Sequence, residues 1–114
     1  MHELTIAQSI LSIAETAVPK NSSAVVTAID IQIGELSAIE IDSLEFAFSV
    51  IKENTPFKKA DLNIEIVRGE AECAHCKTVF MLSAYGTCCP HCNGYSMKIL
   101  KGKEMKVLNI TLDE

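Results

Sequence analysis

The stretch CAHCKTVFMLSAYGTCCPHC, residues 73–92, contains two C-x-x-C pairs separated by twelve residues. Two such pairs at this separation are typical of tetrahedral zinc, because each short turn aims two thiolates at one point and four thiolates complete the coordination shell. The candidate ligands are Cys73, Cys76, Cys89 and Cys92. A complete shell leaves no position for water or substrate, so the spacing predicts a structural Zn(II) that stabilises this segment.

Other interpretations of this segment stay open. A redox C-x-x-C pair is disfavoured by the presence of a second matched pair. The fifth cysteine, Cys88, stands in C-x-x-H register with His91, so spacing alone allows a shell that uses either residue; otherwise Cys88 is a small apolar filler. His75 and His91 occupy equivalent positions inside the two pairs, either as solvated side chains or as switchable ligands.

Length and composition are those of one folded domain. The chain has 114 residues, 48% of them hydrophobic and 5% aromatic, so aliphatic side chains must supply most of the core. No apolar run approaches the roughly 18 residues of a membrane span, and the start MHELTIAQS lacks signal-peptide features. We therefore expect a cytoplasmic protein without a membrane partner, whose five cysteines stay reduced.

The charge is spread unevenly along the chain. Residues 1–70 carry a net charge of −6, and residues 71–114 carry +1. Neither part has the dense basic face that phosphate binding requires, which argues against nucleic acid as a partner.

Helical and strand periodicities alternate outside the cysteine segment. Apolar residues recur every three or four positions over residues 4–18 and 37–54, which is typical of amphipathic helices. Apolar and polar residues alternate over residues 24–34, 62–66 and 108–112, which predicts three strands. The predicted fold is therefore α+β, a small three-stranded sheet with two helices on one face and an inserted zinc-ribbon-like subdomain.

This pattern also predicts a domain organisation. The first domain is expected at residues 1–70, completed by the strand at residues 104–114, and the inserted subdomain at residues 71–103. The open face of the sheet is expected to carry polar side chains, namely Asp30, Gln32, Asn63, Glu65, Asn109 and Thr111. The carboxylates Glu35, Glu40 and Asp42 form either a solvated turn and helix start or a cluster that assists a metal or partner.

Several short motifs together resemble a known family. They are an MHEL start that opens a helix, I-G-E-L-S at the end of a strand, LEFAF in a helix, LNIEI in a strand, the C-x-x-C and C-P-x-C-x-G pairs and a closing strand. In this order, over essentially the whole chain, they resemble the HypA/HybF family of hydrogenase nickel-insertion proteins. The resemblance implies a nickel-binding domain, a zinc domain and no enzymatic activity.

The resemblance further implies that Ni(II) binds at Met1, His2 and Glu3. The α-amine of Met1, the amide nitrogen and imidazole of His2 and the amide nitrogen of Glu3 form a planar four-nitrogen set, which suits Ni(II) or Cu(II) better than zinc. The first N–H groups of a helix have no acceptor within the helix, so a metal can replace their protons at low cost. Without the resemblance, His2 is better explained as an exposed polar residue at a chain end than as a ligand.

The predicted function is that of a metallochaperone that delivers Ni(II) to the precursor of a nickel-iron hydrogenase large subunit. The resemblance implies a HypB-type GTPase as partner and, in some organisms, a parallel role in urease maturation. The chain would act as a monomer or a homodimer. Two alternatives are a zinc-ribbon module that binds protein or RNA, disfavoured by the acidic charge, and a zinc hydrolase, disfavoured by the saturated metal.

Overall fold

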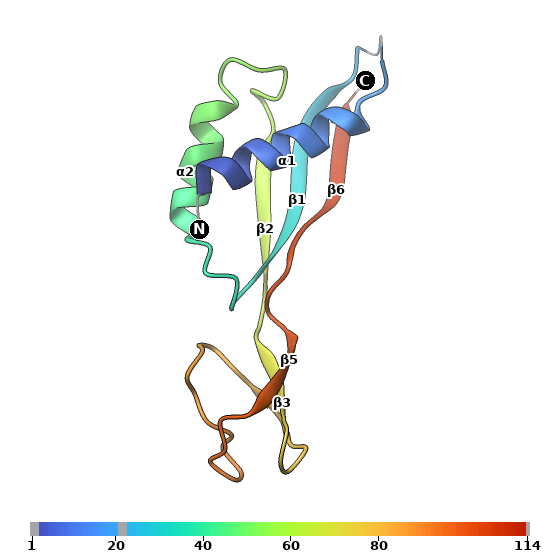
Figure 1. The fold of residues 1–114 in the computed structure, drawn as a ribbon. Helices are drawn as coiled ribbons and strands as arrows, with labels where there is room; N and C mark the ends of the chain where they lie inside the picture. Colours follow the sequence, from blue (N-terminus) through green and yellow to red (C-terminus); the bar gives the residue numbers. More distant parts are fainter. Residues whose placement is uncertain (1–2, 21–22, 114) are drawn as a thin grey trace. The chain divides into compact units, whose positions relative to one another are not determined.

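The computed structural model describes residues 3–20 and 23–113 (Figure 1). The elements of this part follow in the order α1 Glu3–Ala17, β1 Val25–Gly34, α2 Ile41–Ile51, β2 Asp61–Val67, β3 Glu70–Cys73, β4 Val79–Met81, β5 Met97–Lys101 and β6 Met105–Asp113. They form two compact units. The first comprises the described residues of Met1–Ile31, Ile39–Glu65 and Lys106–Glu114, and the second comprises Gln32–Ala38 and Ile66–Met105. The assignment of nickel to one predicted domain and zinc to the other stays a prediction.

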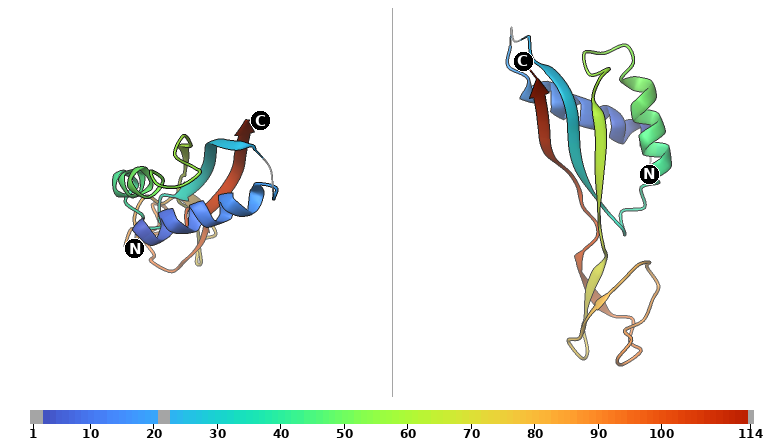
Figure 2. Two further views of the ribbon diagram at one scale, coloured as in Figure 1. Left: turned by 90° about the horizontal axis from the view of Figure 1, so that it is seen from above. Right: turned by 180° about the vertical axis from the view of Figure 1, so that it is seen from behind.

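Both helices of the first unit pack on the same face of its sheet (Figure 2). The buried residues of α1 are Ile6, Ala7, Ile10 and Ala14, and those of α2 are Leu44 and Phe48. Their spacing of three and four residues places each set on one side of its helix. The predicted α+β fold with two helices on one face is confirmed. Within the described chain, neither helix is long and apolar enough to cross a bilayer.

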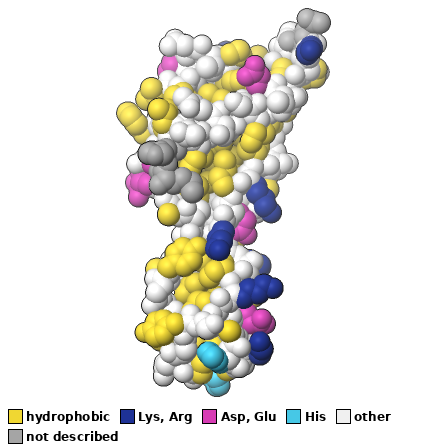
Figure 3. Space-filling model, in the orientation of Figure 1, with side chains coloured by type: hydrophobic (Ala, Val, Ile, Leu, Met, Phe, Trp, Pro, Cys, Tyr) yellow, Lys and Arg dark blue, Asp and Glu magenta, His cyan; other side chains and the backbone are white. Residues whose placement is uncertain are grey.

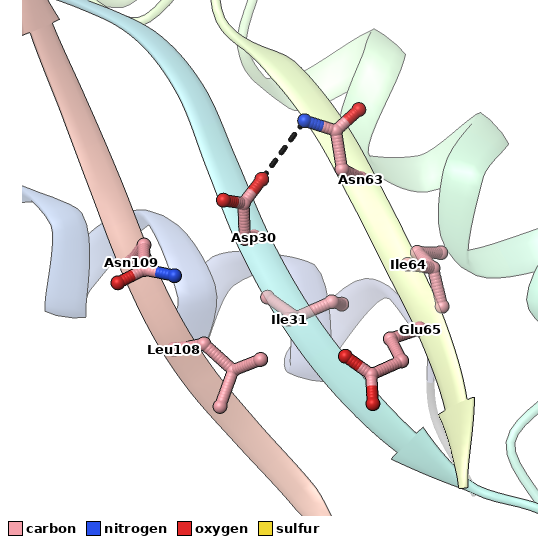
Figure 4. Close-up of a pocket in the computed structure, with 7 residues that line it drawn as sticks. All are labelled: Asp30, Ile31, Asn63, Ile64, Glu65, Leu108 and Asn109. Atoms are coloured by element: carbon pink, nitrogen blue, oxygen red, sulfur yellow. Dashed lines mark hydrogen bonds between the residues drawn. The ribbon is translucent and has the colours of Figure 1, made fainter.

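The sheet of the first unit has the strand order β2-β1-β6. Figure 4 shows β1 and β2 running in the same direction and β6 in the opposite one. Two parallel neighbours need a crossover connection, which α2 provides between β1 and β2. Ile29 and Ile31 of the central strand are fully buried, whereas Asp30 between them is partly exposed. This alternation determines which face of β1 the helices cover.

The other face of this sheet is polar (Figure 4). A shallow hollow of about 260 Å³ on this face is lined by Asp30, Ile31, Asn63, Ile64, Glu65, Leu108 and Asn109. The side-chain amide of Asn63 donates a hydrogen bond of 2.9 Å to Asp30 Oδ1, which joins β2 to β1. The prediction of a polar open face is confirmed at Asp30, Asn63, Glu65 and Asn109.

The second helix begins later than its apolar periodicity predicts. Helical periodicity predicts a start at residue 37, but α2 begins at Ile41. The N–H of Ser37 instead donates to the carbonyl of Gly34 at 3.0 Å, and Ala38 has a φ of 62°. A left-handed residue interrupts a right-handed helix, so this turn sets the start of α2. The prediction of a helix from residue 37 is wrong.

The second unit contains a sheet that the sequence patterns do not predict. In this sheet β3 pairs antiparallel with β4 on one side and with β5 on the other. Strands β3 and β4 have four and three residues, too few for a two-residue period to be recognised. The core of this unit consists of Leu36, Ala71, Cys73, Phe80, Leu82 and Cys89.

The end of β1 contributes to the second unit. The N–H of Glu35 donates to the carbonyl of Val67 at 2.8 Å, and the N–H of Leu36 donates to the carbonyl of Gly102 at 2.7 Å. The backbones approach so closely that a Cβ at Gly34 would overlap the carbonyl oxygen of Gly102. Glycine is therefore required at position 34, and Leu36 is directed into the core of the second unit.

Two isoleucines of α1 test the position of the first core. Ile10 is fully buried and Ile13 is 45% exposed on the same helix. We expect Ile10→Ala to lower the free energy of unfolding by about 2–5 kcal/mol, because it leaves a cavity. Ile13→Ala should lower it by less than about 1 kcal/mol. Urea unfolding followed by circular dichroism measures both values, and equal losses would contradict this packing.

Candidate metal centre

Four cysteine sulfurs converge in the second unit. The Sγ atoms of Cys73, Cys76, Cys89 and Cys92 all lie within 4.8 Å of one another. The Sγ–Sγ distance is 3.5 Å between Cys73 and Cys92 and 3.6 Å between Cys76 and Cys89. A tetrahedral site with Zn–S bonds of about 2.3 Å has sulfur–sulfur edges of about 3.8 Å. The four thiols therefore form a metal site whose dimensions fit zinc.

Two turns of the same conformation position these sulfurs. In the first turn the N–H of Lys77 donates to the carbonyl of Cys73 at 3.1 Å, and in the second the N–H of Asn93 donates to the carbonyl of Cys89 at 2.8 Å. Lys77 and Asn93, which follow the second cysteine of each pair, have φ values of 63° and 62°. The left-handed residue reverses the chain after each pair, so both thiols of a pair point to the same side.

Each turn is closed by a further backbone hydrogen bond. The N–H of Cys73 donates to the carbonyl of Thr78 at 2.9 Å, and the N–H of Cys89 donates to the carbonyl of Gly94 at 2.8 Å. The N–H of His91 lies 3.4 Å from Cys89 Sγ and donates to it. This hydrogen bond orients the Cys89 sulfur within its turn.

The hydroxyl of Thr78 acts directly on Cys76. Thr78 Oγ1 lies 3.2 Å from Cys76 Sγ. Hydrogen bonding from this hydroxyl, and then from the Thr78 backbone, lowers the pKa of Cys76 from its ordinary 9.0 to about 6. Cys76 therefore ionises more readily near neutral pH than an ordinary cysteine thiol does.

The pKa of Cys92 is shifted in the opposite direction, upward. The largest single influence on its pKa is a hydrogen bond from the Gly94 backbone, which lowers it. Contact with Cys73, burial and the remaining two thiols together outweigh that bond and raise the pKa of Cys92 to about 12. The fourth thiol thus resists ionisation beside the others, and a bound divalent cation would remove this resistance.

The remaining predicted metal-binding groups of this segment lie outside the four-sulfur cluster. The Sγ of Cys88 is 4.0 Å from Asn93 Oδ1, and Cys88 is half-buried. His75 and His91 are exposed. The cluster that the fold brings together thus contains the four cysteines of the two C-x-x-C pairs and not Cys88 or His91.

The predicted nickel ligands are described only in part. Met1 and His2 lie outside the described residues. Glu3 is the first residue of α1, and its Oε2 accepts a hydrogen bond of 3.2 Å from the N–H of Glu40, which precedes α2. This contact joins the starts of the two helices. Sequence reasoning missed it because the partners are thirty-seven positions apart along the chain.

The carboxylates after the first strand do not gather into a metal site. Glu35 Oε1 accepts a hydrogen bond of 2.9 Å from the N–H of Gly69, so this side chain braces the backbone of the second unit. Among the described residues, the four cysteines are the only set of three or more potential ligands that lie together. Of the two interpretations of Glu35, Glu40 and Asp42, the described residues thus do not support the one in which these carboxylates hold a metal together.

Similarity to known proteins extends over nearly the whole chain. The HypA family, described as "Hydrogenase/urease nickel incorporation, metallochaperone, hypA", matches residues 1–112. The hydrogenase maturation factor HypA of Parabacteroides distasonis is 39% identical over 112 residues, covering 98% of this chain and 97% of that protein. The HypA of Prosthecochloris aestuarii is 35% identical, covering 99% of this chain and 100% of that protein. The chain belongs to the HypA family.

Solved HypA structures share this fold. The solution structure of the Ni metallochaperone HypA from Helicobacter pylori matches with a TM-score of 0.66 and 29% identity over 96% of both chains. A second HypA solution structure matches with a TM-score of 0.66 and 31% identity over 96% of this chain and 94% of the other. HypA proteins are nickel metallochaperones of hydrogenase maturation and not enzymes, so the zinc hydrolase alternative is wrong.

Two neighbouring cysteines test the composition of the metal site. We expect one equivalent of zinc per native chain, because four thiolates complete its shell. Cys89→Ser should abolish this content, since it removes a buried sulfur of the cluster. Cys88→Ser should keep it. Elemental analysis of protein dialysed without chelator measures the content, and zinc loss in Cys88→Ser would implicate the fifth cysteine instead.

The hydrogen bond from the Thr78 hydroxyl should affect the pH at which the site releases its metal. A thiolate with a lowered pKa contributes its full stabilisation above its ordinary pKa of 9.0 and loses it progressively as the pH falls to about 6. We expect Thr78→Val to move acid release of the metal to higher pH by about one unit, because protons then compete better for Cys76. Thr87→Val is the control, since the Thr87 hydroxyl donates to the Ala84 carbonyl. Release of the metal to a chromogenic chelator, followed as a function of pH, gives the midpoint. An unchanged midpoint in Thr78→Val would contradict a role of the hydroxyl in stabilising the Cys76 thiolate.

Proposed function

We propose that this HypA-family chain carries Ni(II) at its N-terminus to the precursor of a nickel-iron hydrogenase large subunit, while Zn(II) at Cys73, Cys76, Cys89 and Cys92 stabilises the second unit. The observation that carries the proposal is the match with HypA over residues 1–112, including a solved nickel metallochaperone. The nickel ligands would be the Met1 amine, the His2 amide and imidazole nitrogens and the Glu3 amide. Zinc, when bound, supplies a charged cross-link and no reactive site.

The ligand types suit a protein that hands its metal on. A planar set of four nitrogens favours Ni(II) over zinc, so the two metals would be sorted by donor type and geometry. Nickel would leave when protons compete for the imidazole and the amide nitrogens. One contact in the fold supports this arrangement. The Glu3 carboxylate accepts a hydrogen bond from the N–H of Glu40, which anchors the start of α1 beside the start of α2.

The proposed partners follow from the same family membership. The recipient would be the hydrogenase large-subunit precursor, and a HypB-type GTPase would act in the same delivery step. Urease maturation is a further proposed pathway, consistent with the hydrogenase/urease description of the family. The chain would work as a monomer or homodimer in the cytoplasm, where its five cysteines stay reduced.

Nickel titration tests the terminal site. Calorimetry of zinc-loaded protein with an unmodified N-terminus should show one equivalent of Ni(II). We expect His2→Ala and a variant with extra residues before Met1 to lose this binding, because each removes a nitrogen from the planar set. Binding should also weaken as the pH falls below about 6.5, where the imidazole is protonated.

Zinc content is the control for this titration. It should be equal in the native chain and in both variants, since the cysteine cluster lies in the second unit. Equal nickel binding by all three proteins would place the ligands elsewhere, with His75, His91 and Cys88 as the next candidates.

A further inference from the structure

Strand β5 forms an open edge of the sheet in the second unit. In the strand order β4-β3-β5, the described part of the chain gives β5 a neighbour on one side only. The N–H of Ala74 donates to the carbonyl of Ser96 at 2.9 Å, which sets the phase of the ladder between β3 and β5. Because the bonds of an antiparallel ladder alternate, the backbone groups of Met97 and Ile99 point away from β3. This edge can therefore pair with another extended chain.

An apolar hollow lies directly beside this edge. Its volume is about 320 Å³, and its lining includes Tyr85, Tyr95, Met97 and Ile99. The side chains of Met97 and Ile99 pack against the core of the unit. Those of Tyr85 and Tyr95 are 59% and 70% exposed. The lower part of Figure 3 shows hydrophobic side chains gathered on the visible face of this unit.

An open edge and an adjoining hollow are together typical of sites that bind an extended peptide. In such sites the backbone hydrogen bonds supply affinity, and the hollow receives every second side chain of the peptide. The exposed tyrosines suit this role, because aromatic side chains supply a large contact area at protein interfaces. The hollow and the edge of β5 therefore form one candidate binding site.

Lysine side chains follow the same edge. Lys98 and Lys101 of β5 are exposed, and their cross-strand partners on β3 are Glu72 and Glu70, which are half-buried. The glutamates lie one strand further from the open edge, whereas the lysines belong to the strand that a peptide would contact. Opposite charges that lie directly across a strand pair stabilise it. Acidic side chains opposite the two lysines would therefore stabilise an added strand.

The lysines also argue against a second copy of the chain as the occupant. Two β5 strands that paired antiparallel through Met97 and Ile99 would place the Lys98 side chains of both copies directly opposite each other. Like charges in this position destabilise a strand pair. The edge is therefore better matched to a segment of different sequence.

We propose that the edge of β5, with the hollow lined by Tyr85 and Tyr95, binds an extended segment of a partner protein in which acidic and apolar residues alternate. The segment lies antiparallel to β5 and exchanges backbone hydrogen bonds with Met97 and Ile99. Its apolar side chains enter the hollow, and its acidic side chains lie opposite the lysines of β5. All these residues belong to the second unit, so the inference is independent of the proposed nickel site.

A synthetic peptide of alternating glutamate and valine tests the backbone pairing. Binding of the fluorescently labelled peptide to the zinc-loaded chain is measured by anisotropy. In the proposed pairing the valine nitrogens face β5 and the glutamate nitrogens face solvent. We expect methylation of the valine nitrogens to weaken binding tenfold or more, because it removes the donors that face β5. Methylation of the glutamate nitrogens is the matched control and should change binding less than threefold.

Charge is tested with a second peptide, in which lysine replaces glutamate. It should bind at least tenfold more weakly at low salt, because its lysines lie opposite those of β5. The difference between the two peptides should shrink as the salt concentration rises.

Two exposed side chains on different parts of the same unit test the location. Tyr95→Ala should weaken binding of the glutamate–valine peptide at least fivefold, because it removes one wall of the hollow. Met81→Ala should change binding less than twofold, since Met81 is 60% exposed but lies on β4, the opposite edge of the sheet. Equal zinc content of both variants and the native chain shows that the unit still folds.

Three results would overturn the proposal. One is the absence of saturable binding of the glutamate–valine peptide by the native chain. Another is equal affinity for the two methylated peptides, which would exclude backbone pairing in the proposed register. The third is a native dimer in sedimentation that Tyr95→Ala converts to monomer, which would assign this edge to a second copy of the chain.

Discussion

The gathering of four cysteine sulfurs within 4.8 Å of one another is the constraint on which the second unit depends. Hydrogen bonds from Thr78 lower the pKa of Cys76 to about 6, whereas contact with the other thiols and burial raise that of Cys92 to about 12. A bound divalent cation would favour the thiolate form of all four cysteines. Two of the sulfurs, those of Cys73 and Cys89, belong to the core of the unit. Formation of the metal site and packing of the core are therefore one process in this unit.

The sequence predicts the parts of the fold whose side chains repeat over a long enough stretch. The fifteen residues of α1 and the ten of β1 contain several full periods, so both elements and their buried faces are recognisable. The short strands β3 and β4 contain too few residues for a period. The start of α2 is missed for another reason. Helical spacing of apolar residues extends back to residue 37, but the left-handed conformation of Ala38 prevents the helix from beginning there.

Some residues of the candidate sites are likewise predictable from the sequence and others are not. The spacing of the two C-x-x-C pairs is sufficient to predict a four-sulfur cluster, since the turn geometry lies within each pair. The roles of Thr78 and Glu3 are not predictable from spacing, because they depend on which hydroxyl or N–H the fold places beside a given atom. The terminal nickel ligands are proposed from chemistry and family membership, as they involve residues outside the described chain.

The division of the chain between the two units has a consequence for its synthesis. The second unit combines Gln32–Ala38 with Ile66–Met105, and β6, Met105–Asp113, pairs with β1 in the first sheet. The N-terminal segment leaves the ribosome first, yet the second unit lacks a strand until β5, Met97–Lys101, has emerged, and the first unit lacks one until β6 has emerged. Contacts between distant parts of a chain form late. The segment Gln32–Ala38 thus leaves the ribosome before the rest of its unit, and the sheet of the first unit is complete only once β6 has emerged.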